Sequence, residues 1–247
     1  MDPVRLVLIV CGSLSVIACT SSEPSSSSVR EDLIDEPTIA VSTEAVGAEI
    51  ELDARSDGAR LVGVLRPMPQ GTDADRVFDA ELRSDAGVVV LGPVLDARFV
   101  ASGIVLVDPM HTLVLARDGV RTEIDRLAEA PLAVRGDDVV YARGDMPFFE
   151  LAYLEASSGV TRAITEGFAP AYSPAIDSDG SVVFVSSREG RPRLHRVRVD
   201  GTIEALAPTQ RAPSSPRAPR LDRGRLTFED ERGTTTIDVS SGREVSP

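Results

Sequence analysis

The sequence contains neither lysine nor asparagine, and only two cysteines and two histidines occur in its 247 residues. Without asparagine, the chain has no Asn-x-Ser/Thr acceptor for N-linked glycans. Arginine supplies every basic side chain, and 26 basic against 39 acidic residues leave a formal net charge of -13. Because nucleic-acid phosphates are bound by basic surfaces, we expect no nucleic-acid partner for so acidic a chain.

Residues suited to catalysis are also few. His111 and His195 lie in no HExxH motif and in no spacing with cysteine that would place two ligands on one metal. The chain has no Gly-x-Ser-x-Gly elbow, P-loop or Rossmann glycine cluster. We therefore expect a protein that is not an enzyme and that needs no cofactor. His195 occupies an aromatic position of an expected strand and should pack there, whereas His111 follows Asp108-Pro109-Met110 in a turn and should be solvated.

The N-terminal segment has the pattern of a processed signal. Arg5 precedes an apolar run from Leu6 to Ala18, which Cys19 follows. As a helix this run would span about 20 Å, short of the roughly 30 Å hydrocarbon core, so a signal peptide fits better than a membrane span. Val-Ile-Ala-Cys resembles the bacterial lipobox, which implies cleavage between Ala18 and Cys19 and lipid on the Cys19 sulfur. The alternative is an ordinary signal peptide with an incidental cysteine.

The lipobox resemblance also predicts how the chain is divided into signal peptide, tether and folded domain. Residues 1–18 are expected to be the signal peptide, and 19–38 the lipidated cysteine and a flexible tether rich in serine and acid. Residues 39–247 are then the folded domain, which contains no thiol pair and needs no disulfide. These features predict a lipid-anchored protein of the bacterial cell envelope. Thr20-Ser21 after Cys19, in place of aspartate, favours the outer membrane, with the domain facing the periplasm.

The most regular stretch of the chain is 167–208, where short apolar strands are separated by glycine turns. Val182 to Ser187 alternate as in a strand, and Glu189-Gly190 reverses the chain. A second strand pattern ends at Asp200-Gly201, and a third follows at Thr202 to Leu206. Glycine at such steps accepts the positive φ that tight hairpins require.

This stretch resembles the WD40-like propeller repeat of the TolB family. The resemblance rests on Ala175 to Gly180, Val183 to Gly190, Leu194-His195 and Asp200-Gly201, which cover roughly a sixth of the chain. Asp177-Ser178 stands where the family pattern has Ser-Pro, and His195 where it has Tyr. The resemblance implies a β-propeller, and, because TolB binds a peptidoglycan-associated lipoprotein, it also implies a protein partner in the envelope.

Weaker copies of the same pattern occupy the rest of the domain. We expect an all-β fold, a β-propeller of about five four-stranded blades, with a sixth if residues 39–52 add a partial blade. An incomplete ring or a β-sandwich is the alternative. The expected blades are 48–95, 96–125, 126–165, 166–209 and 210–247.

Two charged groupings suggest weaker hypotheses. Asp177 and Asp179, in Asp-Ser-Asp-Gly, could begin a calcium loop, although the distal ligands are missing and Asp-Gly is usually a turn in propeller repeats. An arginine stripe could meet acidic partner residues or simply form a solvated strand face: Arg188, Arg191, Arg193, Arg196 and Arg198. No other metal site is expected.

The sequence as a whole predicts a lipid-anchored envelope protein whose propeller is a non-catalytic scaffold for binding another protein. One alternative is a propeller enzyme or carbohydrate-binding protein with a small ligand in its central channel. Another is a purely structural surface protein.

Overall fold

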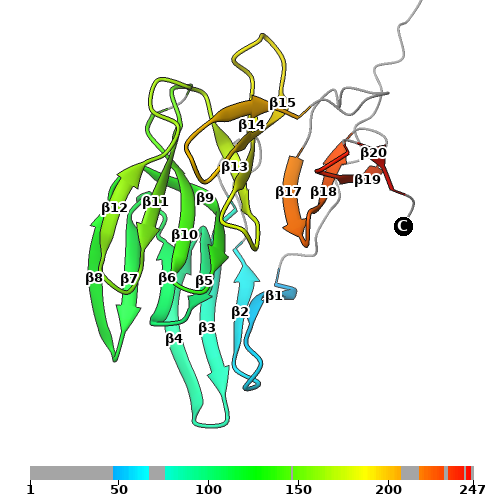
Figure 1. The fold of residues 1–247 in the computed structure, drawn as a ribbon. Coiled ribbons are helices and arrows are strands. Elements are labelled where there is room, and N and C mark those ends of the chain that lie inside the picture. Colours follow the sequence, from blue (N-terminus) through cyan, green and yellow to red (C-terminus); the bar gives the residue numbers. More distant parts are fainter. Residues whose placement is uncertain are drawn as a thin grey trace, which may run out of the picture. The chain divides into compact units, whose positions relative to one another are not determined.

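The computed structural model describes residues 47–66, 76–145, 147–206, 217–230, 233–241 and 243–245. These residues form 20 β-strands in five antiparallel, four-stranded sheets, and no helix occurs among them. Figure 1 shows the sheets following one another along the chain. The predicted signal peptide and tether lie outside the described residues. Within the described residues, no helix is long and apolar enough to cross a membrane.

The five sheets are called blades 1 to 5 in chain order. Blade 1 contains β1 (Glu49–Ala54), β2 (Arg60–Leu65), β3 (Phe78–Ser84) and β4 (Gly87–Val94). Blade 2 contains β5 (Asp96–Val100), β6 (Gly103–Val107), β7 (Leu113–Arg117) and β8 (Val120–Asp125). Blade 3 contains β9 (Ala128–Arg135), β10 (Asp138–Arg143), β11 (Glu150–Glu155) and β12 (Val160–Ala163). Blade 4 contains β13 (Tyr172–Ile176), β14 (Val182–Ser186), β15 (Arg193–Val197) and β16 (Ile203–Ala205). Blade 5 contains β17 (Arg217–Asp222), β18 (Arg225–Asp230), β19 (Gly233–Asp238) and β20 (Arg243–Glu244).

Each blade is a meander, because every strand pairs with the strand before and after it in sequence. Tight turns make this connection possible. Between β7 and β8, for example, Asp118 and Gly119 both have positive φ, at 51° and 77°. Two successive residues of this kind form the hairpin turn whose twist matches that of the flanking strands.

The second strand of blades 2, 3 and 4 is apolar on both faces. In β6, Ile104 and Leu106 pack in a cluster with blade 1, while Val105 and Val107 pack in a cluster with blade 3. Successive side chains of a strand point to opposite faces, so a strand covered on both sides needs a continuous apolar run. The runs in β10 and β14 are buried in the same way.

The hydrophobic core is divided into four clusters, each between two successive blades. The first strands pack in the same succession, β1 against β5, β5 against β9, β9 against β13 and β13 against β17. Sheets packed face to face around their first strands are the arrangement of a propeller. The structure therefore confirms the predicted all-β propeller with five four-stranded blades.

The two terminal blades carry polar side chains on the faces turned away from these clusters. On blade 1, Arg83 of β3 pairs with Glu49 of β1 at 2.7 Å, across β2, and with Glu81 of its own strand at 3.1 Å. On blade 5, the hydroxyls of Thr227 and Thr236 are hydrogen-bonded at 3.0 Å. Among the described residues, blades 5 and 1 do not share a hydrophobic cluster like those that join the successive blades.

Candidate functional site

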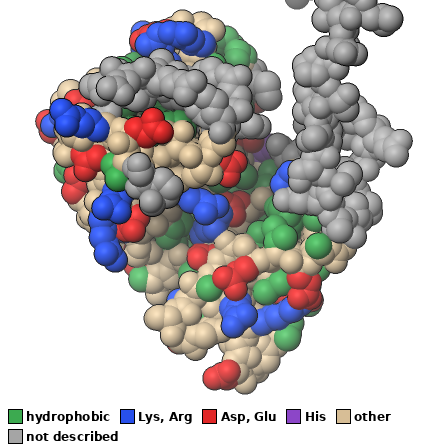
Figure 2. All heavy atoms as spheres, turned by 90° about the vertical axis from the view of Figure 1, so that its right-hand side faces the viewer, with side chains coloured by type: hydrophobic (Ala, Val, Ile, Leu, Met, Phe, Trp, Pro, Cys, Tyr) green, Lys and Arg blue, Asp and Glu red, His purple; other side chains and the backbone are tan. Residues whose placement is uncertain are grey.

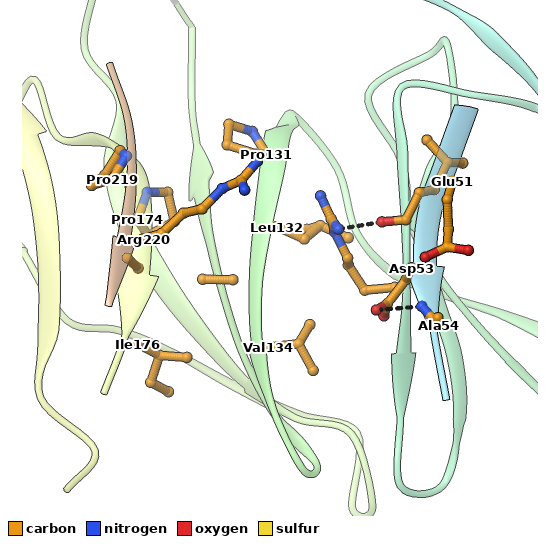
Figure 3. A pocket seen from close by; sticks show the side chains of 14 residues that line it. Glu51, Asp53, Ala54, Pro131, Leu132, Val134, Pro174, Ile176, Pro219 and Arg220 are labelled. Carbon is orange, nitrogen blue, oxygen red and sulfur yellow. Dashed lines mark hydrogen bonds between the residues drawn. The ribbon is translucent and has the colours of Figure 1, made fainter. Parts of the chain in front are cut away.

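All five first strands contribute to a cavity of about 670 Å³. Figure 3 shows the labelled side chains from β1, β9, β13 and β17 around this space. The lining is mainly apolar on β9 and β13 and charged on β1, β5 and β17, where it includes Glu51, Asp53, Arg98 and Arg220. The cavity is thus the central channel of the propeller. Its size is in the range of ligand pockets.

One charged pair in the channel wall is deeply placed. Asp96, at the start of β5, is 5% exposed and lies 3.2 Å from the guanidinium of Arg98. Its carboxylate also accepts hydrogen bonds from the backbone N–H groups of Ala97, at 2.9 Å, and Leu132, at 2.8 Å. Burial raises the pKa of Asp96, and Arg98 and the backbone donors oppose that shift. The pair is therefore a structural element that joins blade 2 to blade 3.

Similar side-chain to backbone hydrogen bonds join other blades around the channel. Asp53 of β1 accepts from the N–H of Phe99 in β5 at 2.8 Å, and Arg98 donates to the carbonyl of Leu52. Arg135 of β9 donates to the carbonyl of Asp177, in the turn that follows β13, at 2.9 Å. Among the charged residues lining the channel, Arg220 extends from β17 toward Pro131 of β9 in Figure 3. Arg220 is exposed, so its guanidinium is accessible to a ligand.

A second feature lies at the outer edge of blade 1. The outermost strand, β4, is eight residues long and contains no charged side chain. Val88, Val89 and Val90 are 60%, 56% and 70% exposed. The outermost strands of the other blades contain charged residues, and β16 and β20 have only three and two residues. Edge strands are usually blunted by charge, shortness, proline or a β-bulge. β4 has Pro93 and a register shift against β3 near Leu91, but its run from Val88 to Val90 contains neither charge nor proline.

An apolar groove of about 530 Å³ runs beside β4 between blades 1 and 2. Val89, Val90 and Leu91 line one side, and Phe99 and Ile104 lie among the blade 2 residues that line the other. An uncharged strand edge beside an apolar groove can accept an added strand. On β4 the carbonyl of Leu91 already accepts a hydrogen bond from Arg121 at 2.6 Å, so Val88 to Val90 is the part proposed for strand addition. Main-chain hydrogen bonds then supply affinity, and the groove receives alternate side chains.

No protein-family model matches the chain, and no curated protein matches it in sequence. Several solved structures match the chain in fold. TolB from Acinetobacter baumannii matches with a TM-score of 0.56 and 16% identity, over 78% of this chain and 54% of TolB. The putative TolB from Agrobacterium tumefaciens also gives 0.56 and 16%, over 81% of this chain and 80% of that protein. The fold is that of a TolB-like β-propeller.

The TolB-like propeller also resembles part of a peptidase. Porphyromonas gingivalis dipeptidyl peptidase 4 matches with a TM-score of 0.54 and 12% identity, over 81% of this chain but only 37% of the enzyme. The chain likewise spans about half of the Acinetobacter TolB. At such identities the matches establish the fold, and the activities and partners of these proteins are not transferred by it.

The residues singled out from the sequence fall in different places. Ala18 and Cys19 lie outside the described residues. Asp177 and Asp179 lie in the β13–β14 turn, where Asp177 accepts from the Ser178 N–H at 2.6 Å and Asp179 from the Ser181 N–H at 2.8 Å. Asp179 also pairs with Arg196 at 3.0 Å. The described part of the chain contains no group of three metal-ligating side chains. Calcium binding at this turn stays a prediction.

The histidines are both engaged within the fold. His195 is 3% exposed and stacks on Phe184, with ring centroids 5.5 Å apart, while Phe168 meets it edge-on at 5.1 Å. Burial lowers its pKa. His111 is paired through Nδ1 with Glu129 at 3.0 Å. We expected a solvated His111 from the sequence. The pair with Glu129 was not predicted, because the two residues lie 18 positions apart and no local pattern links them.

The arginine stripe is largely satisfied within blade 4. Arg193 pairs with Glu189 at 3.3 Å, and Arg198 with Glu204 at 2.9 Å. The Arg188 guanidinium lies over the Phe168 ring at 4.9 Å. Figure 2 shows arginine and acidic side chains interspersed over the face that it draws. These contacts favour the solvated-face interpretation over a dedicated acidic-partner site.

The channel residues and the β4 edge were not singled out as site residues from the sequence. A signal for the channel existed, because Arg98 and Arg220 lie in the N-terminal parts of the expected blades 96–125 and 210–247. For β4 the available signal was the uncharged run from Ala86 to Leu95 at the outermost position of a blade.

Proposed function

We propose that this protein is a lipid-anchored, non-catalytic scaffold of the bacterial envelope that binds another protein through its propeller. The observation that supports this proposal is the edge strand β4. It has eight uncharged residues, three of them exposed valines, and it lies beside an apolar groove. An extended segment of a partner adds to this edge as a fifth strand of blade 1. Its alternate side chains enter the groove between blades 1 and 2.

Photo-crosslinking in intact cells tests this interaction. A photoreactive amino acid replaces Val89 on β4 in the full chain, and in a matched variant it replaces Val160 on β12, which is 59% exposed and begins a strand that contains an arginine. We expect a discrete adduct at position 89, identified by mass spectrometry, and little or none at 160. Equal adduct patterns at the two positions would contradict strand addition at β4.

The anchor requires its own measurement. We propose that Cys19 carries diacylglycerol and an acylated amine, because two or three acyl chains give stable membrane anchoring whereas a single chain binds only marginally and reversibly. Intact mass of the detergent-extracted chain should then show loss of residues 1–18 and gain of acyl mass. The Cys19→Ser variant should lack that mass. An unacylated mature chain would overturn the anchor and leave the β4 proposal to stand on the crosslinking result.

The channel supports a second candidate function, the binding of a small carbohydrate or anionic ligand. Arg220 is exposed in a cavity of about 670 Å³ that also contains Glu51 and Asp53, so hydrogen-bond donors and acceptors face one space. A thermal-shift screen with glycans and calcium tests this candidate. A ligand-dependent rise in melting temperature that is lost in Arg220→Gln, but kept in the exposed-surface control Arg223→Gln, would favour it.

A further inference from the structure

Large apolar side chains are exposed at the end of the propeller where β1 begins. In a four-stranded meander, the first strand begins at the end that also carries the connections between second and third strands and between successive blades. β1 begins at Glu49 at this end. The loops that contain Met110 and Phe148, and the connection that contains Leu127, lie there too.

These three side chains are unusually exposed for their size. Met110 is 80% exposed, Phe148 is 73% and Leu127 is 47%. Leu127 has a φ of 58°, a conformation that non-glycine residues rarely adopt. The backbone thus holds a large apolar side chain at the surface.

Backbone hydrogen bonds bring the three residues into one neighbourhood. The N–H of Ala128 donates to the carbonyl of His111, next to Met110, at 2.8 Å, and the N–H of Gly144 donates to the carbonyl of Leu127 at 2.9 Å. Leu127 and Phe148 also line the same shallow pocket, whose charged residues are two arginines and two acids: Arg126, Arg143, Asp125 and Glu150. We call Met110, Leu127 and Phe148 the apolar end patch.

We propose that the apolar end patch rests on the lipid surface to which the chain is anchored, with Phe148 inserted among the headgroups. This inference rests on the proposed lipid anchor at Cys19. Roughly 27 residues separate Cys19 from the described fold. If they form the flexible tether that the sequence predicts, its reach of about 30 Å limits the distance between the start of β1 and the membrane.

The chemistry of the patch suits a zwitterionic lipid surface. Apolar side chains bind at the boundary between headgroups and acyl chains. The charges beside the patch are paired, Arg126 with Glu123 and Arg143 with Asp125 and Glu150, so its border has no strong excess of either sign. The chain's net charge of -13 would disfavour a strongly anionic bilayer. The opposite end offers a matched reference, because Val199, in the turn after β15, is 75% exposed and lies away from the anchored end.

Depth-dependent fluorescence quenching tests the proposal on the acylated full chain. Phe148→Cys and Val199→Cys each receive an environment-sensitive dye, because acylation of Cys19 leaves no other thiol in the processed chain. The proteins are reconstituted into vesicles of phosphatidylethanolamine and phosphatidylcholine that carry brominated acyl chains. We expect severalfold stronger quenching at position 148 than at position 199.

The possible outcomes distinguish a failure of the patch assignment from a failure of the lipid anchor. Acylated protein with equal quenching at both positions would overturn the patch assignment and leave the anchor intact. A mature chain without acyl mass would overturn the anchor and the inference together. Shielding of the dye at position 148 from an aqueous quencher in native envelopes, without quenching by brominated lipid, would assign the patch to a protein and overturn the lipid assignment.

Discussion

At the scale of single residues, His195 shows how a polar ring can replace an aromatic one in a propeller strand. Its ring forms a mutually contacting cluster with those of Phe168 and Phe184, and Nδ1 lies 3.3 Å from the carbonyl of Arg193. Because burial disfavours the charged imidazolium, the pKa of His195 lies below its ordinary value of 6.5. The neutral ring is the form that the core accepts.

This arrangement predicts an acid-sensitive component of stability. The unfolded chain binds a proton at His195 near pH 6.5, while the folded chain resists it, so this contribution is present above that pH and is lost as the pH falls. The free energy of unfolding should therefore fall more between about pH 8 and pH 5 in the wild type than in His195→Phe. Equal slopes in chemical denaturation would contradict the assignment.

Asp96 provides the second prediction at this scale. Its carboxylate holds Arg98 and the N–H groups of Ala97 and Leu132 in the channel wall. Asp96→Ala leaves these donors without their acceptor and should lower the free energy of unfolding by about 3 kcal/mol, as expected when one partner of a buried pair is removed. Asp57→Ala, which breaks an exposed pair with Arg55, should change it little. Similar losses from the two variants would count against a structural role for Asp96.

At the scale of elements, the β5–β6 hairpin depends on a glycine for two reasons. Gly103 has a φ of 156°, and a Cβ at this position would collide with the carbonyl oxygen of Ala116 in β7. Close approach of this kind fixes the register in which β6 lies between its neighbours. Gly119 differs, because its φ of 77° is equally unusual but the space around it is open.

We expect alanine at these two glycine positions to lower the free energy of unfolding by different amounts. Gly119→Ala should cost only the strain of the left-handed conformation, about 1 kcal/mol. Gly103→Ala should cost more, because the backbone of β7 must also move. Chemical denaturation of both variants measures the difference, and an equal or smaller loss for Gly103→Ala would show that the hairpin shifts freely.

At the scale of the whole molecule, the three tyrosines report on the packing of two blades. Tyr141 donates to Asp125 at 2.5 Å, and Tyr153 donates to Asp138. Burial, followed by the hydrogen bond to Asp138, raises the pKa of Tyr153 to about 12. Burial also raises the pKa values of Tyr141 and Tyr172.

These raised pKa values predict alkaline behaviour. Unfolded tyrosines ionise near pH 10, so the stability that comes from neutral, packed phenols is present below that pH and lost as the pH rises above it. In a spectrophotometric titration, tyrosinate should form near pH 10 in denaturant but only at higher pH in the folded chain. Tyr153→Phe should remove part of the folded signal. A folded titration that overlays the denatured one would contradict the packing described.

The fold could be predicted from the sequence because its signals are local. Asp200-Gly201 and Glu189-Gly190 are turn signals, and the apolar run from Val182 to Val185 is a buried strand by pattern alone. The window 122–133, which has the best helical spacing, spans the end of β8, a turn and the start of β9. Both segments of this window form strands despite the weak helical pattern, because each strand gains hydrogen-bonded partners in its own sheet.

The sequence by itself determined the meander of short strands, since alternation and glycine turns act between near neighbours. It also determined the charge balance and the lipobox-like Val-Ile-Ala-Cys pattern. Only the tertiary structure decided which side chains meet. Asp96 with Leu132, Arg220 in the channel, and Met110 near Leu127 and Phe148 belong to different strands or loops, and their proximity arises from packing one blade against the next.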